Sequence, residues 1–496
     1  MSLASRRSIR LMVTLVVGSL RLLAGDHRAA EPDKWIGLST QHFQLYTLSD
    51  SRSATEALQR FETVYSFFAQ APLLKGVPQS PVQIIAFNSD PEFQAYTVNS
   101  GAAAYYQRTH RGDYIVMRDL APQNFEFSVH EYTHLMIEHL GLRPPLWMNE
   151  GLADLYSSLR SGHGQVRLGG APLGRLDTLQ NEPWLDLETL FAVAYGSPYY
   201  SQLDKMRVFY AESWALTHML VLDPEYSPQF PEFLSMLSHG TSSRECFQLV
   251  YHKSLNQAIA DLRRHLFGKE LASEVLEIDL TTASGIEPKS IVSPQEQAEL
   301  SLADLAAFDG HSPADGETQL KSLSNKYPDS PSAEESLGYL ALVQNRPADA
   351  RLHFAKAAER HSTSSEVLFY LAQLLQASGG PDEQAVDLLN RALAIDPGSY
   401  SARIELGCLA AKDNHFELAV STLSSIGAVK PEHGYLVSYA LAYSYAQLDQ
   451  NEEARSYGEK ARSLAAGIAE QKKADDLLRY VDDREPEHRI TVRAAR

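Results

Sequence analysis

The stretch Val129-His130-Glu131-Tyr132-Thr133-His134-Leu135-Met136 decides which fold this sequence predicts. His130 and His134 stand four residues apart, so a helix places them one turn apart on one face, where two imidazoles can bind one Zn²⁺. Glu131 lies beside them and can act as general base toward a water molecule that the metal activates. Because the same spacing also arises by chance in helices, the neighbouring sequence has to decide what the motif means.

A second helix with a matching carboxylate follows the first. Gly141 and the two prolines at 144–145 predict where the first helix ends. Glu150, sixteen residues after His134, can return as the third ligand. Asp154 lies one turn further along the same face and can accept a hydrogen bond from a ligating imidazole. Two histidines and one carboxylate leave a fourth position open for water, as in a catalytic zinc site, whereas a structural site is closed.

Together the two helices resemble the gluzincin clan of zinc metallopeptidases, and especially the peptidase-MA-like families found beside tetratricopeptide (TPR) repeats in bacteria. The resemblance spans residues 35–267. It implies an α+β metallopeptidase domain in which His130, His134 and Glu150 bind one Zn²⁺ per chain, with Glu131 as general base and Asp154 supporting a ligand. Fifteen residues separate His134 from Glu150, fewer than in the aminopeptidase and thermolysin branches, so the resemblance carries no cleavage preference.

Peptide hydrolysis also needs a donor for the oxyanion that forms on the substrate. Residues 209–218 resemble the downstream helix that supplies this donor in related families, and Tyr210 is the predicted donor because a phenol stays neutral at pH 7. A packing role between helices is the alternative for Tyr210. The rival donors are His218, Tyr195, Tyr199 and Tyr200.

The residues before the motif predict a mixed α+β lobe. Their pattern indicates strands at 42–46 and 81–87, a helix at 54–68 and a hairpin at 102–117. In related enzymes the strand before the active helix pairs with extended substrate. The resemblance therefore implies that the second arm of the hairpin, Tyr114 to Met117, is the substrate edge. The alternative is that it is simply another strand of the sheet.

The last third of the chain carries an internal repeat. Ala350, Ala385, Ala419 and Ala454 follow at intervals of 35, 34 and 35 residues, each near the expected start of a second helix. Twelve or thirteen residues earlier stands a small residue preceded by leucine: Gly338, Ala372, Gly407 and Ala442. This pattern resembles the TPR and predicts an all-α solenoid of four repeats from residue 331, with a degenerate repeat before them.

At 496 residues the chain is too long for one compact core. The predicted parts are a targeting segment at 1–30, a metallopeptidase domain at 31–270, a linker at 271–292, a TPR array at 293–470 and a polar C-terminal tail at 471–496. Arg6, Arg7 and Arg10 precede the apolar run 11–20, which is too short for a stable transmembrane anchor of about 20 residues. We therefore expect export to the periplasm or the cell exterior. A basic start on a cytoplasmic protein is the alternative.

Charge and cysteine content exclude other classes of protein. Lys and Arg number 44 and Asp and Glu 62, so that 44 − 62 = −18, and a nucleic acid is not an expected partner. Cys246 and Cys408 are the two cysteines of the chain, too few for a disulfide framework or a Cys-based zinc site.

The main functional hypothesis is zinc-dependent hydrolysis of peptide bonds, with the concave surface of the TPR array recruiting a protein substrate or partner. The alternative is a TPR adaptor or scaffold whose metallopeptidase-like lobe is inactive, although an intact Glu131 argues against it. A third hypothesis, hydrolysis of an ester or another amide, shares the same ligands and differs in pocket shape.

Overall fold

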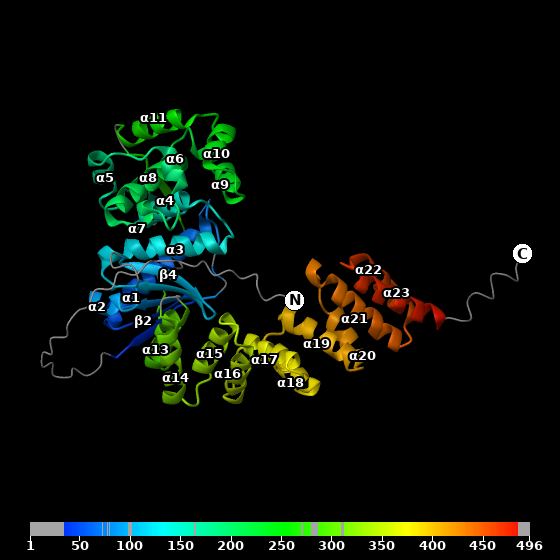
Figure 1. Cartoon of the computed structure of the whole chain (residues 1–496). Coiled ribbons are helices and arrows are strands. Elements are labelled where there is room, and N and C mark those ends of the chain that lie inside the picture. Colours follow the sequence, from blue (N-terminus) through cyan, green and yellow to red (C-terminus); the bar gives the residue numbers. More distant parts are fainter. Residues whose placement is uncertain are drawn as a thin grey trace, which may run out of the picture. The chain divides into compact units, whose positions relative to one another are not determined.

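The computed structural model describes residues 34–484, except for residues 72, 77, 79, 98–101, 163–164, 269–270, 279–285 and 309–311. The targeting segment predicted at 1–30 lies outside the described residues. The chain divides into two compact units, residues 1–316 and 317–496 (Figure 1). Within the described ranges, none of the helices has both the length and the apolar character that spanning a membrane requires.

The first unit is built around a six-stranded mixed sheet with the strand order β4-β5-β3-β2-β1-β9. The strands are β1 (Ile36–Ser39), β2 (Phe43–Thr47), β3 (Val82–Ala86), β4 (Ala104–Thr109), β5 (Gly112–Met117) and β9 (Lys289–Ser290). β2, β3 and β5 are parallel neighbours, and most of their side chains are buried, as in central strands covered on both faces. The expectation that Tyr114 to Met117 forms a substrate edge is wrong, because β5 lies inside the sheet and β4 forms its edge.

Helices cover both faces of this sheet. They are α1 (Ser51–Gln70) and α3 (Phe125–His139) on one face and α13 (Pro294–Phe308) on the other, with the short α2 (Asp90–Gln94) before β4. The side chain of Asp50 caps α1 by accepting backbone hydrogen bonds from its first turn. Phe61 of α1 and Tyr132 of α3 share one core with β2, while Leu302 of α13 packs in a second core with Tyr114.

Beyond α3 the first unit continues as a helical lobe, and α3 lies between this lobe and the sheet (Figure 1). The lobe contains α4 (Leu146–Ser157), α5 (Arg175–Asn181), α6 (Leu187–Ala192), α7 (Pro198–Ser201), α8 (Leu203–Leu222), α9 (Phe230–Ser238), α10 (Ser243–Val250) and α11 (Leu255–Leu266), and a small sheet of β6 (Arg160–Gly162), β7 (Gln165–Leu168) and β8 (Glu274–Glu277). α4 and α8 approach closely at Gly151. A Cβ atom there would lie 2.1 Å from Thr217 Oγ1 and 2.4 Å from the carbonyl oxygen of Ser213.

The stretch expected to be a linker, 271–292, supplies strands to both sheets of the first unit. β8 pairs with β7, and β9 pairs with β1. The following helix α13, expected to open the repeat array at 293, belongs to the core of the first unit. The division between the units falls after Gly316, later than the sequence indicates, because the apolar partners of α13 are strands near the start of the chain.

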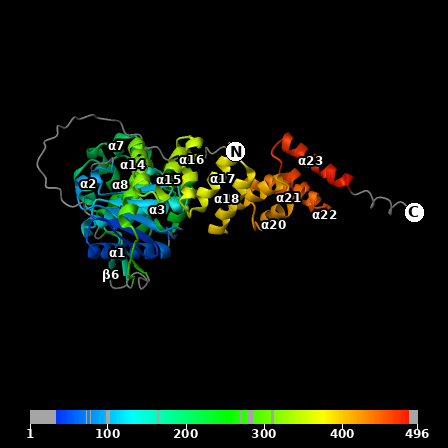
Figure 2. The same ribbon diagram turned by 90° about the horizontal axis from the view of Figure 1, so that it is seen from below.

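The second unit is a row of helix pairs in chain order (Figures 1 and 2). After α14 (Pro313–Lys326), which crosses the division, the pairs are α15 (Ser332–Val343) and α16 (Pro347–Glu359), α17 (Ser365–Ala377) and α18 (Asp382–Ile395), α19 (Tyr400–Lys412) and α20 (Phe416–Ser424), and α21 (Gly434–Gln447) and α22 (Asn451–Leu464). Ala350, Ala385, Ala419 and Ala454 are each the fourth residue of a second helix and are fully buried. The TPR-type period is therefore confirmed.

The turns inside the helix pairs repeat with the same period. Asn345, Gly379, Asn414 and Asp449 all have left-handed backbone, with φ of 57°, 73°, 62° and 58°. Small residues let the paired helices meet, since a Cβ atom on Gly338 would lie 2.3 Å from the Phe354 ring.

The segment expected as a polar tail at 471–496 begins inside a helix. This helix, α23 (Ile468–Asp483), packs on α22 and buries Ala474, Leu477 and Val481. One face is apolar and the other carries charges, as suits a helix that closes a repeat array. Residues 485–496 lie outside the described part of the chain.

Candidate metal centre

The structure brings His130 and His134 of α3 together with Glu150 of α4. The left-handed Gly141, with φ of 68°, follows the end of α3, and α4 starts directly after Pro145. The two histidine Nε2 atoms lie 3.1 Å apart, and Glu150 Oε2 lies 3.3 Å from the Nε2 of His130 and 3.5 Å from that of His134. Among the described residues these three form a group able to hold a metal ion.

The donor atoms have the spacing that a tetrahedral zinc site needs. Zinc–ligand bonds of 2.0–2.1 Å at tetrahedral angles separate two donors by about 3.3 Å, which is close to the three distances above. Glu150 Oε2 is buried and accepts no hydrogen bond from the described residues. A buried polar atom without a hydrogen bond costs about 1–3 kcal/mol, so a cation at this position would satisfy the carboxylate. The residues present therefore fit Zn²⁺.

Both imidazoles are oriented from behind by oxygen atoms. Asp154 Oδ1 lies 3.0 Å from His130 Nδ1, and Arg175 donates from Nε to Asp154 Oδ2 at 2.7 Å. Asn149 Oδ1 lies 3.2 Å from His134 Nδ1. When each Nδ1 donates a proton to its oxygen, each Nε2 presents a lone pair to the centre. The sequence predicts the role of Asp154 behind a ligating imidazole, but it did not predict the roles of Asn149 and Arg175. Asn149 could have been found from its position directly before Glu150. No feature of the neighbouring sequence marks Arg175.

The charges around the site favour a cation. Burial opposes protonation of His130, but the hydrogen bond to Asp154 and the Glu150 carboxylate outweigh burial and raise its pKa to about 10. Burial would raise the pKa of Glu150, but the positive charge on His134 and the contact with His130 outweigh burial and lower the pKa. Both pKa shifts reflect the carboxylates that surround the imidazoles and attract protons to them. A metal dication can replace these protons.

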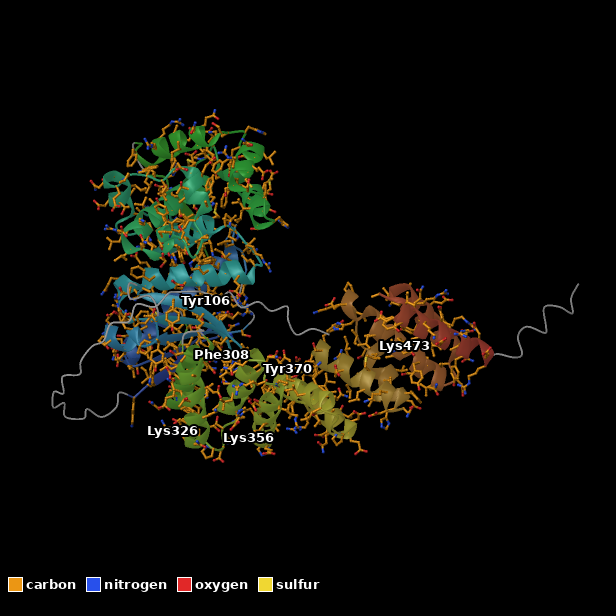
Figure 3. The ribbon with its side chains drawn as sticks, in the orientation of Figure 1. Tyr106, Phe308, Lys326, Lys356, Tyr370 and Lys473 are labelled. Carbon is orange, nitrogen blue, oxygen red and sulfur yellow. The ribbon has the colours of Figure 1, made fainter. Side chains whose placement is uncertain are left out.

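Glu131 is held by the edge strand of the sheet. Its Oε2 accepts a hydrogen bond from the backbone N–H of Tyr106 in β4 at 2.9 Å. Figure 3 labels Tyr106 beside α3, and its hydroxyl donates to Asp113 Oδ1 at 2.7 Å. Burial raises the pKa of Glu131 above its usual value, which brings a carboxylate closer to the range that suits a general base.

Two tyrosines of the helical lobe reach the centre. The ring of Tyr210 lies 6.4 Å from the His130 ring, with the Arg175 guanidinium 5.0 Å above it. The hydroxyl of Tyr200, on α7, donates to Glu150 Oε1 at 3.1 Å. Burial and the Glu150 charge both raise the pKa of Tyr210 and of Tyr200, so both phenols stay protonated and can donate.

The other candidate donors have different surroundings. His218 faces His265 through Nδ1 at 2.8 Å and the carbonyl oxygen of Gly169 through Nε2 at 3.0 Å, so both of its nitrogens are occupied. Burial lowers the pKa of His218 to about 4. Tyr195 is 45% exposed and packs edge-on against Tyr200, and burial and the Glu150 charge raise its pKa. The ring of Tyr199 lies 5.9 Å from the Lys205 ammonium. Among these candidates, Tyr210 makes a ring contact with the ligand residue His130 and Tyr200 a hydrogen bond with the ligand residue Glu150.

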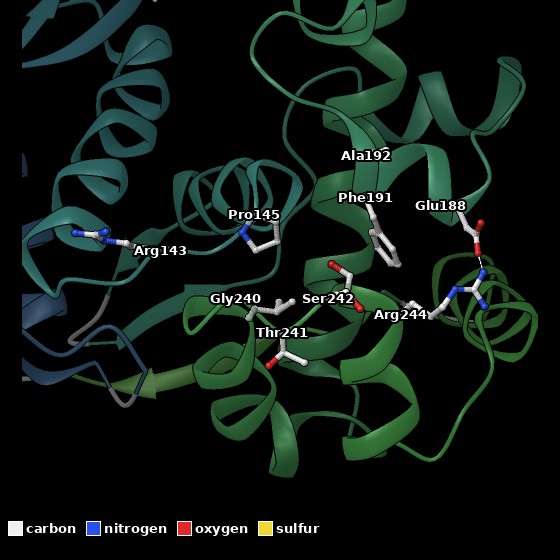
Figure 4. Close-up of a pocket in the computed structure, with 11 residues that line it drawn as sticks. Arg143, Pro145, Glu188, Phe191, Ala192, Gly240, Thr241, Ser242 and Arg244 are labelled. Atoms are coloured by element: carbon white, nitrogen blue, oxygen red, sulfur yellow. Dashed lines mark ion pairs between the residues drawn. The ribbon is translucent and has the colours of Figure 1, made fainter. Parts of the chain in front are cut away.

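A cavity of about 600 Å³ lies in the helical lobe, apart from this cluster. Pro145, Phe191 and Thr241 are among its lining residues, and Glu188 forms an ion pair with Arg244 at its wall (Figure 4). None of the metal-centre residues described above lines this cavity.

Comparison with known proteins found similar solved structures and no matching family. No family model matches the chain, and no curated protein matches it. The solved structure of YrrB, described as a TPR protein with an unusual peptide-binding site, is 17% identical, and the match covers 36% of this chain and 91% of YrrB with a TM-score of 0.32. MamA from Desulfovibrio magneticus RS-1 is 20% identical over 33% of this chain and 89% of MamA, with a TM-score of 0.28. PilW, a type IV pilus biogenesis factor, is 17% identical over 39% of this chain and 88% of PilW, with a TM-score of 0.28.

The period, the buried alanines and the left-handed turns make the second unit a TPR-type helical repeat. The chain is a repeat protein of this class that also carries an α/β unit with a cluster of two histidines and one glutamate. The metallopeptidase fold and the gluzincin resemblance stay predictions.

Proposed function

We propose that the first unit is a zinc-dependent peptidase with one Zn²⁺ per chain on His130, His134 and Glu150. One observation carries the proposal: three donor atoms converge within 3.1–3.5 Å, and one of them, Glu150 Oε2, is buried with no hydrogen bond from the part of the chain that the structure describes. A zinc ion bound there would supply Lewis acidity, making a water molecule more acidic and polarising a substrate carbonyl.

The residues of the chain divide the remaining work. Glu131, held by the Tyr106 N–H, takes the proton from the attacking water and can pass it to the leaving amine. Tyr210 donates a hydrogen bond to the oxygen of the scissile carbonyl as negative charge develops there. Asp154 and Asn149 keep the two imidazoles in the orientation that ligation needs.

The role proposed for the second unit is binding of a protein substrate or partner on the concave surface of the repeats. Stacked helix pairs present an extended surface that single domains of the same size lack. A second candidate function follows from this unit alone: a TPR adaptor whose first unit has no catalytic activity.

Elemental analysis of the full chain, together with a peptide-library cleavage assay, separates these functions. We expect one zinc per chain and cleavage activity. The double variant His130→Ala, His134→Ala should lose both, whereas His239→Ala, at an exposed histidine outside the cluster, should keep both. Zinc content unchanged in the double variant would disprove the ligand assignment.

The variant Glu131→Gln tests the catalytic step itself. Its amide cannot take a proton from water, so we expect zinc to remain bound while the cleavage rate falls by about a hundredfold or more. A wild-type chain that binds zinc and cleaves nothing in the library would favour the adaptor.

A further inference from the structure

The two oxygens of the Glu150 carboxylate have different surroundings. Oε1 accepts a hydrogen bond from the Tyr200 hydroxyl at 3.1 Å. Oε2 accepts none from the described residues and is the oxygen that faces the Nε2 atoms of His130 and His134. A carboxylate can bind a metal through one oxygen or through both, and this environment leaves one oxygen for the metal.

The position of Tyr200 is fixed by aromatic packing. Its ring lies edge-on to Tyr195 at 5.3 Å and to Phe209 at 6.0 Å, and stacks with Tyr210 at 6.2 Å. Tyr200 lies on the short helix α7. The side chain of Ser197 caps the start of this helix by accepting a hydrogen bond from the backbone N–H of Tyr199. Because the ring is held on three sides, the hydroxyl cannot follow Glu150 if the carboxylate rotates.

The two tyrosines near the ligands have different partners. Tyr200 donates the single proton of its hydroxyl to Glu150 Oε1, whereas the ring of Tyr210 stacks on Tyr200 and lies 6.4 Å from the His130 ring. A phenol whose proton is directed at a ligand carboxylate has none left for a substrate oxygen. The donor and positioning roles therefore fall on different residues.

We infer that Tyr200 is a positioning residue that restricts Glu150 to binding the metal through one oxygen and so keeps the fourth coordination position open. This inference rests on the proposed zinc site and adds a residue to it. Three protein atoms and one water would then be the ligands when Tyr200 is present, and Oε1 would add a fourth protein–metal contact, the fifth ligand, when its hydroxyl is removed.

Cobalt substitution tests this inference without relying on activity. Co²⁺ accepts the same ligands as Zn²⁺, and the intensity of its visible d–d bands falls when coordination rises from four to five. Tyr200→Phe keeps the ring and its packing but removes the hydroxyl. We therefore expect the visible bands of the Co²⁺-bound variant to be weaker than those of the wild type, and the dissociation constant for the metal to change by about tenfold. Tyr195→Phe is the matched control, because it removes a hydroxyl from the same aromatic cluster without contacting Glu150 through a hydrogen bond, and its spectrum should match that of the wild type.

A third variant separates the two roles. Tyr210→Phe should lower kcat/KM and leave the cobalt spectrum unchanged. If Tyr200→Phe is folded, binds Co²⁺ and has the wild-type spectrum, the inference is wrong while the metal centre stands. If the wild-type chain takes up no Co²⁺ or Zn²⁺, the proposed centre and the role of Tyr200 are both wrong.

Discussion

Gly151→Ala tests whether the contact between α4 and α8 positions Glu150, the residue directly before it. The added Cβ would lie 2.1 Å from Thr217 Oγ1 and 2.4 Å from the carbonyl oxygen of Ser213. A backbone carbonyl cannot rotate away as a side chain can, so the two helices have to separate. Overfilling a packed interface costs about 1–3 kcal/mol, whereas alanine gains about 1 kcal/mol over glycine in a helix. We expect a net loss of up to about 2 kcal/mol in the stability of the first unit.

The movement should also displace Glu150, and we expect zinc affinity to fall by about tenfold, as when a group that orients a ligand is lost. Thermal unfolding and competition with a zinc chelator measure the two effects. Gly196→Ala is the control, because no atom lies within 4 Å of a Cβ there. Adding Thr217→Ala removes the contact with Thr217 Oγ1 and should restore part of the lost stability. The recovery is partial because the contact with the Ser213 carbonyl oxygen remains. Unchanged stability and zinc affinity in Gly151→Ala would refute the reasoning.

Three further predictions concern buried groups. Burial raises the pKa of Glu212 from 4.5 to about 8. As pH rises from 4.5 to 8, the unfolded chain therefore loses the Glu212 proton at a lower pH than the folded chain, and the free energy of unfolding falls. In scanning calorimetry, Glu212→Gln should raise Tm more at pH 8 than at pH 4.5. Gly338→Ala should destabilise the second unit by up to about 2 kcal/mol in urea unfolding, because an overpacking cost of about 1–3 kcal/mol is partly offset by about 1 kcal/mol that alanine gains over glycine in a helix. Adding Phe354→Leu should relieve part of this loss, because the new Cβ meets the Phe354 ring. Arg175→Gln removes a 2.7 Å hydrogen bond to Asp154 and should weaken zinc binding about tenfold in chelator competition, with no change in affinity contradicting the orienting role.

The sequence predicts those parts of the structure that depend on near neighbours. His130 and His134 share a face because a helix repeats every 3.6 residues, and the alanines of the repeats mark a period that any reader of the sequence can measure. Glu150 comes near them because the chain turns back at once after Gly141. Whether zinc binds there stays a prediction.

The parts that the sequence did not predict depend on distant partners. α13 has the helical pattern of a repeat helix, but its buried side chains pack on strands formed long before it in the chain. Arg175 reaches Asp154 from a different helix, after Gly174 has turned the chain with φ of 79°. Periodicity describes which face of a helix is apolar, and it contains no information on which surface that face will cover.

The pairing of β9 with β1 has a consequence for how this chain folds during synthesis. Lys289 contacts Ser39 across 250 residues of sequence, so the sheet of the first unit cannot be completed until most of that unit has left the ribosome. Until then β1 has an open edge that other chains can pair with. Each helix pair of the second unit, by contrast, closes between neighbours in the sequence and can form as soon as it emerges. A fragment that stops at Ser290 would also lack α13 and expose the apolar face of the sheet, so an isolated first unit has to extend through Phe308.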